Sequence, residues 1–214
     1  MHDSPPFTPQ ESLFILDCLE CAATLLRGPD RDSSLTLIMQ GVPALASSPE
    51  ALSLGLDKEL AALENTCSNL SQKQDWTELL AQDHLQLFVT ARGGVPAPPY
   101  ASCHLPGDGR IMGPAALAMR DRLQAADLQV AGEGNEPPDH IATQLEYLYY
   151  LLHTALILGQ DPAEDPAQFT QDAMLSWVPA FAKAVAGADR TGLFSGLTAM
   201  IQRLLQTIAR NFPS

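Results

Sequence analysis

Basic residues are scarce in this chain. Its 214 residues include 12 Lys and Arg against 25 Asp and Glu, which gives a formal net charge of −13 at pH 7. Proteins that bind nucleic acids need a basic surface to neutralise phosphates, so this balance disfavours a nucleic-acid partner. The deficit is greatest between Leu123 and Ala182, where no Lys or Arg occurs.

The same span is rich in acidic side chains. They are Asp127, Glu133, Glu136, Asp139, Glu146, Asp161, Glu164, Asp165 and Asp172. An acidic surface attracts cationic partners and speeds their association. A solvated surface that only keeps the protein soluble explains the same composition, so charge alone leaves both interpretations open.

Long apolar runs are also missing. Hydrophobic residues make up 46% of the chain, enough for a substantial core, but no run approaches the roughly 18 residues of a membrane span. The first residues, Met1 to Pro6, have neither the basic nor the apolar region of a secretory signal. We therefore expect a cytoplasmic protein without membrane insertion.

Neither sustained strand alternation nor an internal repeat occurs, whereas apolar residues recur at helical spacing. The expected helices span about residues 8–27, 33–46, 48–70, 75–91, 114–126, 137–159, 165–186 and 189–210. In the third of these, Leu52, Leu56, Leu60, Leu63 and Cys67 are expected to point inward. The sequence thus predicts an all-α protein, a single globular bundle of about eight helices.

The predicted organisation is simple. Residues 1–7 form a flexible tail, and residues 8–214 form one all-helical domain. Two loops, near residues 92–113 and 127–138, separate helices in the middle of the chain. The first is rich in Gly and Pro and is too long to be idle inside a compact domain, so we expect both loops to carry function.

Patterns for catalysis and metal binding are weak. Cys18 and Cys21 form a single C-x-x-C inside a helical pattern, and no second pair completes a zinc site. The chain has neither a P-loop nor a G-x-S-x-G motif, and in Ser102-Cys103-His104 adjacent side chains point apart. We expect buried thiols without a role, no cofactor and no metal.

The chain is organised around residues 135–140, Asn-Glu-Pro-Pro-Asp-His, which precede the longest apolar helix. The two prolines suit a helix start, where Glu136 and Asp139 would face the positive end of the helix dipole. The inward positions of the helix are Ile141, Leu145, Leu148, Leu152 and Leu156. Beside this face, polar stripes are formed by Asp139, Thr143, Glu146 and Tyr150, and by His140, Gln144 and Tyr147.

A metal- or acid-dependent all-α hydrolase that uses Asp139, His140 and Glu146 is the alternative interpretation of this helix. Helical metal ligands usually lie three or four residues apart. Asp139 and Glu146 lie seven apart, roughly 10 Å along the axis. The spacing therefore disfavours the hydrolase without removing it.

Several motifs together resemble the TorD/DmsD family of redox-enzyme maturation chaperones, which is related to the NarJ group. The hallmark is Glu-Pro-x-Asp-His before a long helix, here residues 136–140. Further similarities are Leu87-Phe88, the Pro-Pro-Tyr-x-Ser loop at residues 98–102, the turn at residues 108–113, and Phe169 with Trp177-Val178-Pro179-Ala180-Phe181. The similarity extends over about residues 10–210.

The resemblance implies a cytoplasmic, non-enzymatic chaperone. Such a protein binds the twin-arginine signal peptide and the apo form of a molybdoenzyme, assists cofactor insertion and prevents premature export. A basic leader followed by an apolar segment would complement an acidic rim beside an apolar groove. The expected leader-binding residues are Tyr100, Ser102, Glu136, Pro137, Asp139, His140 and Trp177.

Within this set, Glu136 and Asp139 would meet arginines, and Tyr100 and Trp177 would receive the apolar segment. Substitutions of Asp139 and His140 are then expected to weaken leader binding more than folding.

We expect a monomer. Domain-swapped dimers and weak guanine-nucleotide binding occur in such families, but no pattern here supports either. A scaffold that binds folded enzyme without its leader is a third interpretation.

Overall fold

The first helix starts at the capping box that the sequence contains. The computed structural model describes residues 6–28, 31–106, 112–129 and 136–212. In it, α1 (Pro9–Arg27) begins where the Thr8 hydroxyl accepts a hydrogen bond from the Glu11 N–H at 3.2 Å. The Glu11 carboxylate in turn accepts the Thr8 N–H at 2.9 Å, so both exposed donors are satisfied.

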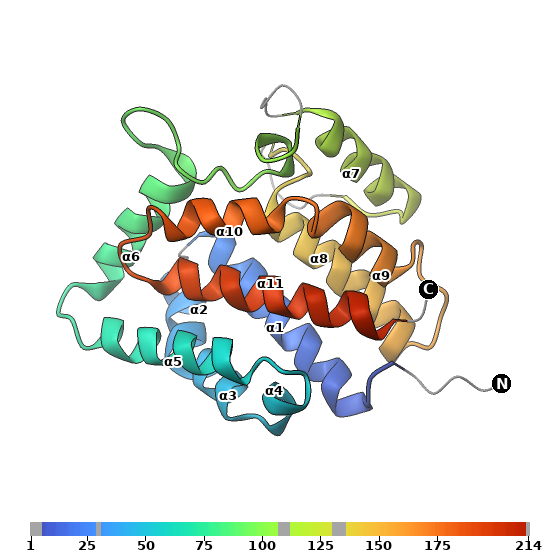
Figure 1. Cartoon of the computed structure of the whole chain (residues 1–214), viewed down its shortest axis with the longest axis horizontal. Helices are drawn as coiled ribbons and strands as arrows, with labels where there is room; N and C mark the ends of the chain where they lie inside the picture. Colours follow the sequence, from blue (N-terminus) through green and yellow to red (C-terminus); the bar gives the residue numbers. More distant parts are fainter. Residues whose placement is uncertain (1–5, 29–30, 107–111, 130–135, 213–214) are drawn as a thin grey trace.

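Among the described residues the structure is a single helical bundle without strands (Figure 1). The α-helices after α1 are α2 (Arg31–Thr36), α3 (Val42–Ser47), α4 (Pro49–Ser53), α5 (Asp57–Ser71), α6 (Trp76–His84), α7 (Pro114–Ala125), α8 (Ile141–Leu152), α9 (Pro166–Phe169), α10 (Val178–Ala186) and α11 (Leu193–Asn211). The expected all-α class is confirmed.

Short segments of other helical types complete these elements. The π-helical turns are η1 (Leu37–Gly41), η2 (Leu85–Val89), η4 (His153–Ile157) and η5 (Thr170–Met174), and a 3₁₀ turn, η3, spans Ala101–Cys103. Each π turn continues the α-helix before it, so residues 31–47 and 141–157 run as unbroken helical rods.

Two helices expected to be continuous are interrupted. The helix expected over residues 48–70 breaks between Ser53 and Asp57, where Gly55 adopts a positive φ of 68°. Leu52 is consequently 72% exposed, so its expected inward orientation is wrong, whereas Leu56 and Leu60 are fully buried. The helix expected over residues 165–186 restarts at Val178, where Pro179 suits a first turn.

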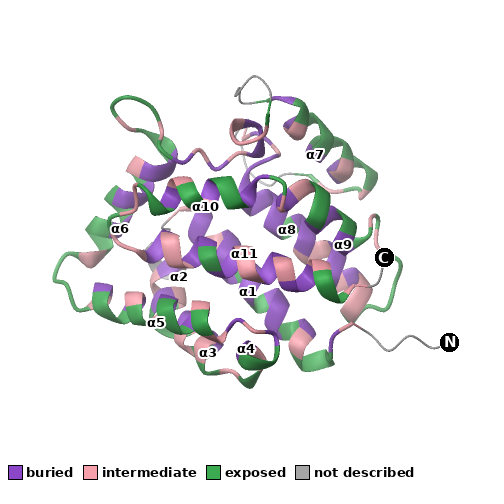
Figure 2. Cartoon of the chain, viewed as in Figure 1, coloured by how far each residue is buried: buried purple, intermediate pink, exposed green. Residues whose placement is uncertain are grey.

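The core is centred on α1, α8 and α11, the helices with the most continuous burial (Figure 2). Helix α1 packs along α8 and also contacts α11. On α8, Ile141, Leu145, Leu148 and Leu152 have no exposed surface. The predicted inward face of this helix is therefore confirmed at these positions.

The N-terminal segment is packed from residue 7 onward. Phe7 is 4% exposed, and its ring lies 5.8 Å from that of Phe212. The flexible tail expected over residues 1–7 is wrong at Phe7, and residues 1–5 lie outside the described part of the chain. Residues 107–111 and 130–135 of the two expected functional loops lie outside it as well.

None of the described helices combines the length and the apolar character that crossing a membrane requires.

Two leucines test the burial pattern. Leu145→Ala opens a cavity in the centre of the bundle and is expected to lower the free energy of unfolding by about 2–5 kcal/mol. Leu52→Ala, the same change at an exposed site, is expected to alter it by less than about 0.5 kcal/mol. Chemical denaturation followed by circular dichroism measures both. Equal losses in the two variants would contradict the assigned core.

Candidate functional site

The loop before η3 and the start of α8 are joined by backbone hydrogen bonds. The Ala101 N–H donates to the Asp139 carbonyl at 3.1 Å, and the Ile141 N–H donates to the Pro99 carbonyl at 2.8 Å. These bonds form an isolated antiparallel bridge between Tyr100 and His140. Two motifs almost forty residues apart in the sequence therefore form one unit.

Asp139 lies inside this unit. Its side chain has no exposed surface, and its Oδ2 accepts hydrogen bonds from the Ser102 N–H at 2.8 Å and the Ser102 hydroxyl at 2.5 Å. Its Oδ1 is buried and has no partner among the described residues. In this structure Asp139 and Ser102 bond each other and hold the loop against the start of α8, and their direct contact with a ligand stays a prediction.

Trp177 is also buried within the unit. Its indole has no exposed surface, and its Nε1–H donates to Oε1 of Gln144 at 3.1 Å. The Gln144 amide in turn donates to the Asp139 carbonyl at 3.4 Å. In this arrangement the indole links α10 to α8, and its expected contact with an apolar segment stays a prediction.

His104 and Gln144 complete these contacts, and sequence reasoning assigned neither of them to the site. The His104 ring stacks on Trp177 with centroids 5.6 Å apart, and its Nε2 is 2.7 Å from the Pro98 carbonyl. Gln144 lay on a predicted polar stripe of the helix. The spacing of a stripe could not indicate that its amide would meet an indole from another helix.

His140 caps α8. Its Nδ1 accepts the Ala142 N–H at 3.1 Å, and the Tyr100 ring lies edge-on to it with centroids 5.2 Å apart. Burial, followed by the nearby Arg27 charge, lowers the pKa of His140 to about 4. The imidazole is therefore neutral at pH 7, and its 3.7 Å approach to Glu136 is not an ion pair.

Arg27, at the end of α1, forms ion pairs with the acidic side chains beside this cap. Its Nε donates to Oε1 of Glu146 at 2.7 Å and one terminal nitrogen donates to Oε2 at 2.5 Å. The other terminal nitrogen reaches Glu136 at 2.9 Å. Hydrogen bonding to Glu146 is the main cause that raises the pKa of Arg27. The two carboxylates thus form a guanidinium-binding site that the chain fills itself.

The acidic span of the sequence is therefore partly neutralised in the fold. Besides Arg27, Arg122 pairs with a carboxylate of this span, Glu164, at 2.9 Å. Asp165 caps α9 by accepting the Ala167 N–H. Sequence reasoning missed both arginines because each lies outside the span and is brought in by tertiary packing.

A pocket of about 370 Å³ opens between α1 and α8 next to this ion-pair network. Its walls include Glu20 and Thr24 from α1, and Glu146 and Tyr149 from α8. Glu20 and Glu146 are both exposed. The pocket thus provides two carboxylates, one of which already binds a guanidinium group, at a surface that a ligand can reach.

The residues of the alternative hydrolase are engaged in other contacts. Ser102 donates hydrogen bonds to Asp139, and one ring nitrogen of His140 accepts a backbone N–H of the helix. Arg27 donates to both carboxylate oxygens of Glu146. Within residues 6–28, 31–106, 112–129 and 136–212, no group of three His, Cys, Asp or Glu side chains could hold a metal ion. The geometry gives the hydrolase no support.

Comparison with known proteins adds family information to this geometry. Residues 49–183 match the model of a family described as the nitrate reductase delta subunit. A chaperone protein TorD of Vibrio vulnificus strain YJ016 is 35% identical over 140 residues, covering 63% of this chain and 64% of the relative. The match thus spans just under two thirds of that relative.

A chaperone protein TorD of Actinobacillus succinogenes is 31% identical over 160 residues, covering 74% of this chain and 76% of the relative. Among solved structures, a putative redox enzyme maturation protein from Archaeoglobus fulgidus aligns with a TM-score of 0.56 at 21% identity. That alignment covers 96% of this chain and 99% of the other, so the two proteins share a fold over nearly their full lengths.

The buried Asp139 gives a stability prediction that differs from the one made on the sequence. Asp139→Ala leaves two buried Ser102 donors without an acceptor and is expected to lower the free energy of unfolding by about 2–4 kcal/mol. Asp139→Asn keeps an acceptor and should cost less. Asp121→Ala, at an exposed site on α7, is the control. Denaturant titration measures all three, and a loss for Asp139→Ala as small as the control's would contradict the positioning role.

The pKa of His140 predicts how stability depends on pH. An unfolded histidine titrates near 6.5 and the folded one near 4, so between these values the unfolded state binds more protons. Stability should therefore decrease as pH falls from 6.5 to 4. His140→Asn keeps a capping side chain but removes this titration, and should lessen the decrease by up to about 3 kcal/mol.

Denaturation at a series of pH values compares the two proteins. His84 and His104 have lowered pKa values for the same reason, burial, but they are present in both proteins and cancel in the difference. Parallel stability curves for wild type and His140→Asn would show that His140 is not held neutral by the fold.

Proposed function

We propose, because this chain belongs to the nitrate reductase delta subunit family and has TorD chaperones among its relatives, that it is a cytoplasmic chaperone of a molybdoenzyme. In this proposal it is not an enzyme. It binds the twin-arginine signal peptide and the apo form of the catalytic subunit, assists cofactor insertion and prevents premature export. The observation that carries the proposal is this family membership.

The ion-pair network of Arg27 supports a role in arginine recognition. Glu146 already binds one guanidinium group through two parallel hydrogen bonds, the geometry that suits arginine better than lysine. The network lies at the surface, with side-chain exposures of 31% for Arg27 and 50% for Glu146. An arginine of the leader would enter the adjoining pocket, between Glu146 and Glu20, and compete with Arg27.

The predicted site residues take two roles in this proposal. Glu136, together with the half-exposed Tyr100, contacts the leader directly. Asp139, Ser102, Pro137 and Trp177 are buried and hold the start of α8 in place, and neutral His140 caps the helix beside Glu136. The described parts of the two long loops supply Tyr100, Ser102 and Glu136, which fits their expected functional role. A monomer suffices for this arrangement.

A panel of synthetic twin-arginine leaders from the molybdoenzymes of the native host tests leader binding. Titration calorimetry of the wild type is expected to find at least one leader that binds, with an affinity that falls as salt rises, because exposed charges are screened over about 8–10 Å. Glu146→Gln should weaken that leader about tenfold or more.

Glu78→Gln, an equal change of charge on α6, is the control and should leave the affinity nearly unchanged. If no leader binds, the proposal that the protein recognises a twin-arginine leader is wrong. If only the folded enzyme binds, the protein acts as an assembly scaffold instead.

Competition between Arg27 and a leader arginine for Glu146 leads to a second prediction. If a leader arginine displaces Arg27 from Glu146, then Arg27→Gln frees the carboxylate and should strengthen leader binding several-fold. Arg120→Gln removes the same charge from an exposed position on α7 and corrects for the change in net charge. The same calorimetry compares both variants, and weaker binding by Arg27→Gln would show that Arg27 supports the site instead of competing for it.

A further inference from the structure

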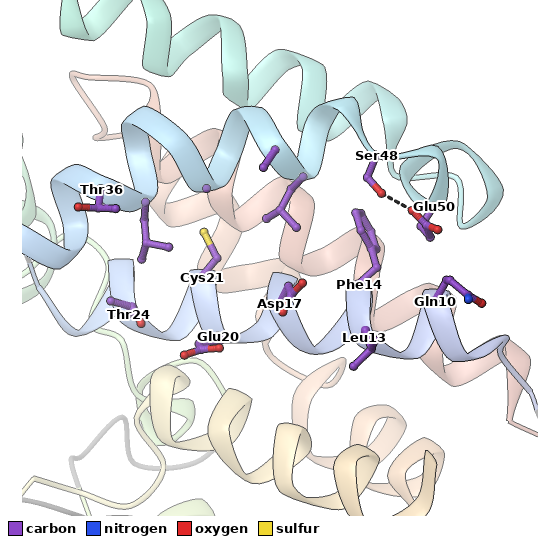
Figure 3. A pocket seen from close by; sticks show the side chains of 14 residues that line it. Gln10, Leu13, Phe14, Asp17, Glu20, Cys21, Thr24, Thr36, Ser48 and Glu50 are labelled. Carbon is purple, nitrogen blue, oxygen red and sulfur yellow. Dashed lines mark hydrogen bonds between the residues drawn. The ribbon is translucent and has the colours of Figure 1, made fainter. Parts of the chain in front are cut away.

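A second and larger hollow lies on the other side of α1. It is a groove of about 930 Å³ whose one wall is α1 and whose other wall is the rod of α2, η1 and α3. Figure 3 shows Phe14 and Cys21 of α1 pointing toward the opposite wall. None of the residues expected from the sequence to bind the leader lies in this groove.

The groove exists because one wall is built from small side chains. Gly41 and Ala44 lie three residues apart on the helical rod, and Ser48 follows directly after its last turn; all three line the groove. Larger apolar groups form its floor and edges, among them Phe14, Leu37 and Leu45. Leu13 also lines it and is 55% exposed, so the apolar lining reaches the molecular surface.

Acidic side chains border this apolar surface. Asp17 and Glu20 of α1 and Glu50 of α4 line the groove. Partial burial raises the pKa of Asp17. No Lys or Arg side chain lines the groove among the described residues. A ligand that fits must therefore be apolar and accompanied by positive charge.

The groove lies next to the pocket between α1 and α8. Glu20 and Thr24 line both hollows, so only the exposed ridge of α1 separates them. Along that ridge Leu13, Asp17, Glu20, Thr24 and Arg27 follow at helical spacing. The surface thus changes from apolar at Leu13 to acidic at Glu20 and then to the guanidinium-binding network at Arg27.

We propose that this groove receives the apolar segment that follows the arginines of the leader, while the arginines occupy the pocket between Glu20 and Glu146. The proposal rests on the proposed function and adds a location for the larger part of the ligand. From Arg27 back to Leu13, the surface of α1 presents acidic groups first and apolar groups next, which complements the basic and then apolar order of a leader that runs antiparallel to α1. An apolar region of about 7–15 residues has the length of a segment that binds an apolar groove as a helix.

The charge of the groove argues against a second copy of this chain as its occupant. The chain carries a net charge of −13, and the border of the groove is acidic, so another copy would bring like charge to like charge. A basic and apolar segment meets no such penalty.

Filling the groove tests the location. Ala44 is exposed and lines the groove, so Ala44→Trp adds bulk there without disturbing the core. Ala81→Trp makes the same change at an exposed site of α6 that lines neither hollow. The probes are the tightest-binding leader of the panel above and a variant of it whose apolar segment is replaced by Ser and Gly.

Ala44→Trp is expected to weaken the full leader at least tenfold and the variant leader hardly at all, whereas Ala81→Trp changes neither. As a second measurement, a photo-reactive residue in the apolar segment of the full leader should cross-link to α1 or α3 of the wild type. Thermal melting verifies that both variants are folded.

The outcomes separate this inference from the proposed function. If the wild type binds the leader and Ala44→Trp binds it equally well, or if cross-links fall outside α1, η1 and α3, the groove is not the site although the chaperone function stands. If no leader binds the wild type, both proposals are overturned.

Discussion

The contact between Asp139 and Ser102 is the constraint on which the rest of the structure depends. A carboxylate without exposed surface is costly unless its environment supplies donors, and Ser102 supplies two from a loop 37 residues away. The loop at residues 98–104 must therefore lie against the start of α8. Gln144 and Trp177 then bring α10 to the same place.

This buried unit determines what the surface can offer. Because Asp139, Ser102 and Trp177 are used internally, the groups that remain for a ligand are those around them, above all Glu136, Glu146 and the acidic ridge of α1. In the structure the charged motif has a positioning effect. It fixes the start of α8, and with it the carboxylates that Arg27 occupies.

The arrangement also explains why a very acidic chain is not uniformly acidic at its surface. Arg27 and Arg122 arrive from outside the basic-free span and pair with three of its carboxylates. In the proposed function, a cationic ligand would meet a site where the chain's own arginine competes, and competition of this kind would favour a ligand that presents guanidinium groups in the right geometry over one that is merely positive.

The sequence by itself determined the helical class, most helix limits and the inward face of α8, because these follow from local capping and from apolar spacing along one helix. It also located the start of α8 as central. Only the tertiary structure decided that Asp139 and Trp177 are buried, that Arg27 binds Glu146, and that small residues on η1 and α3 leave a groove against α1. These depend on contacts between separate elements, with Asp139 and Ser102 37 residues apart and Arg27 and Glu146 119 residues apart, and spacing within one helix carries no information about its partner.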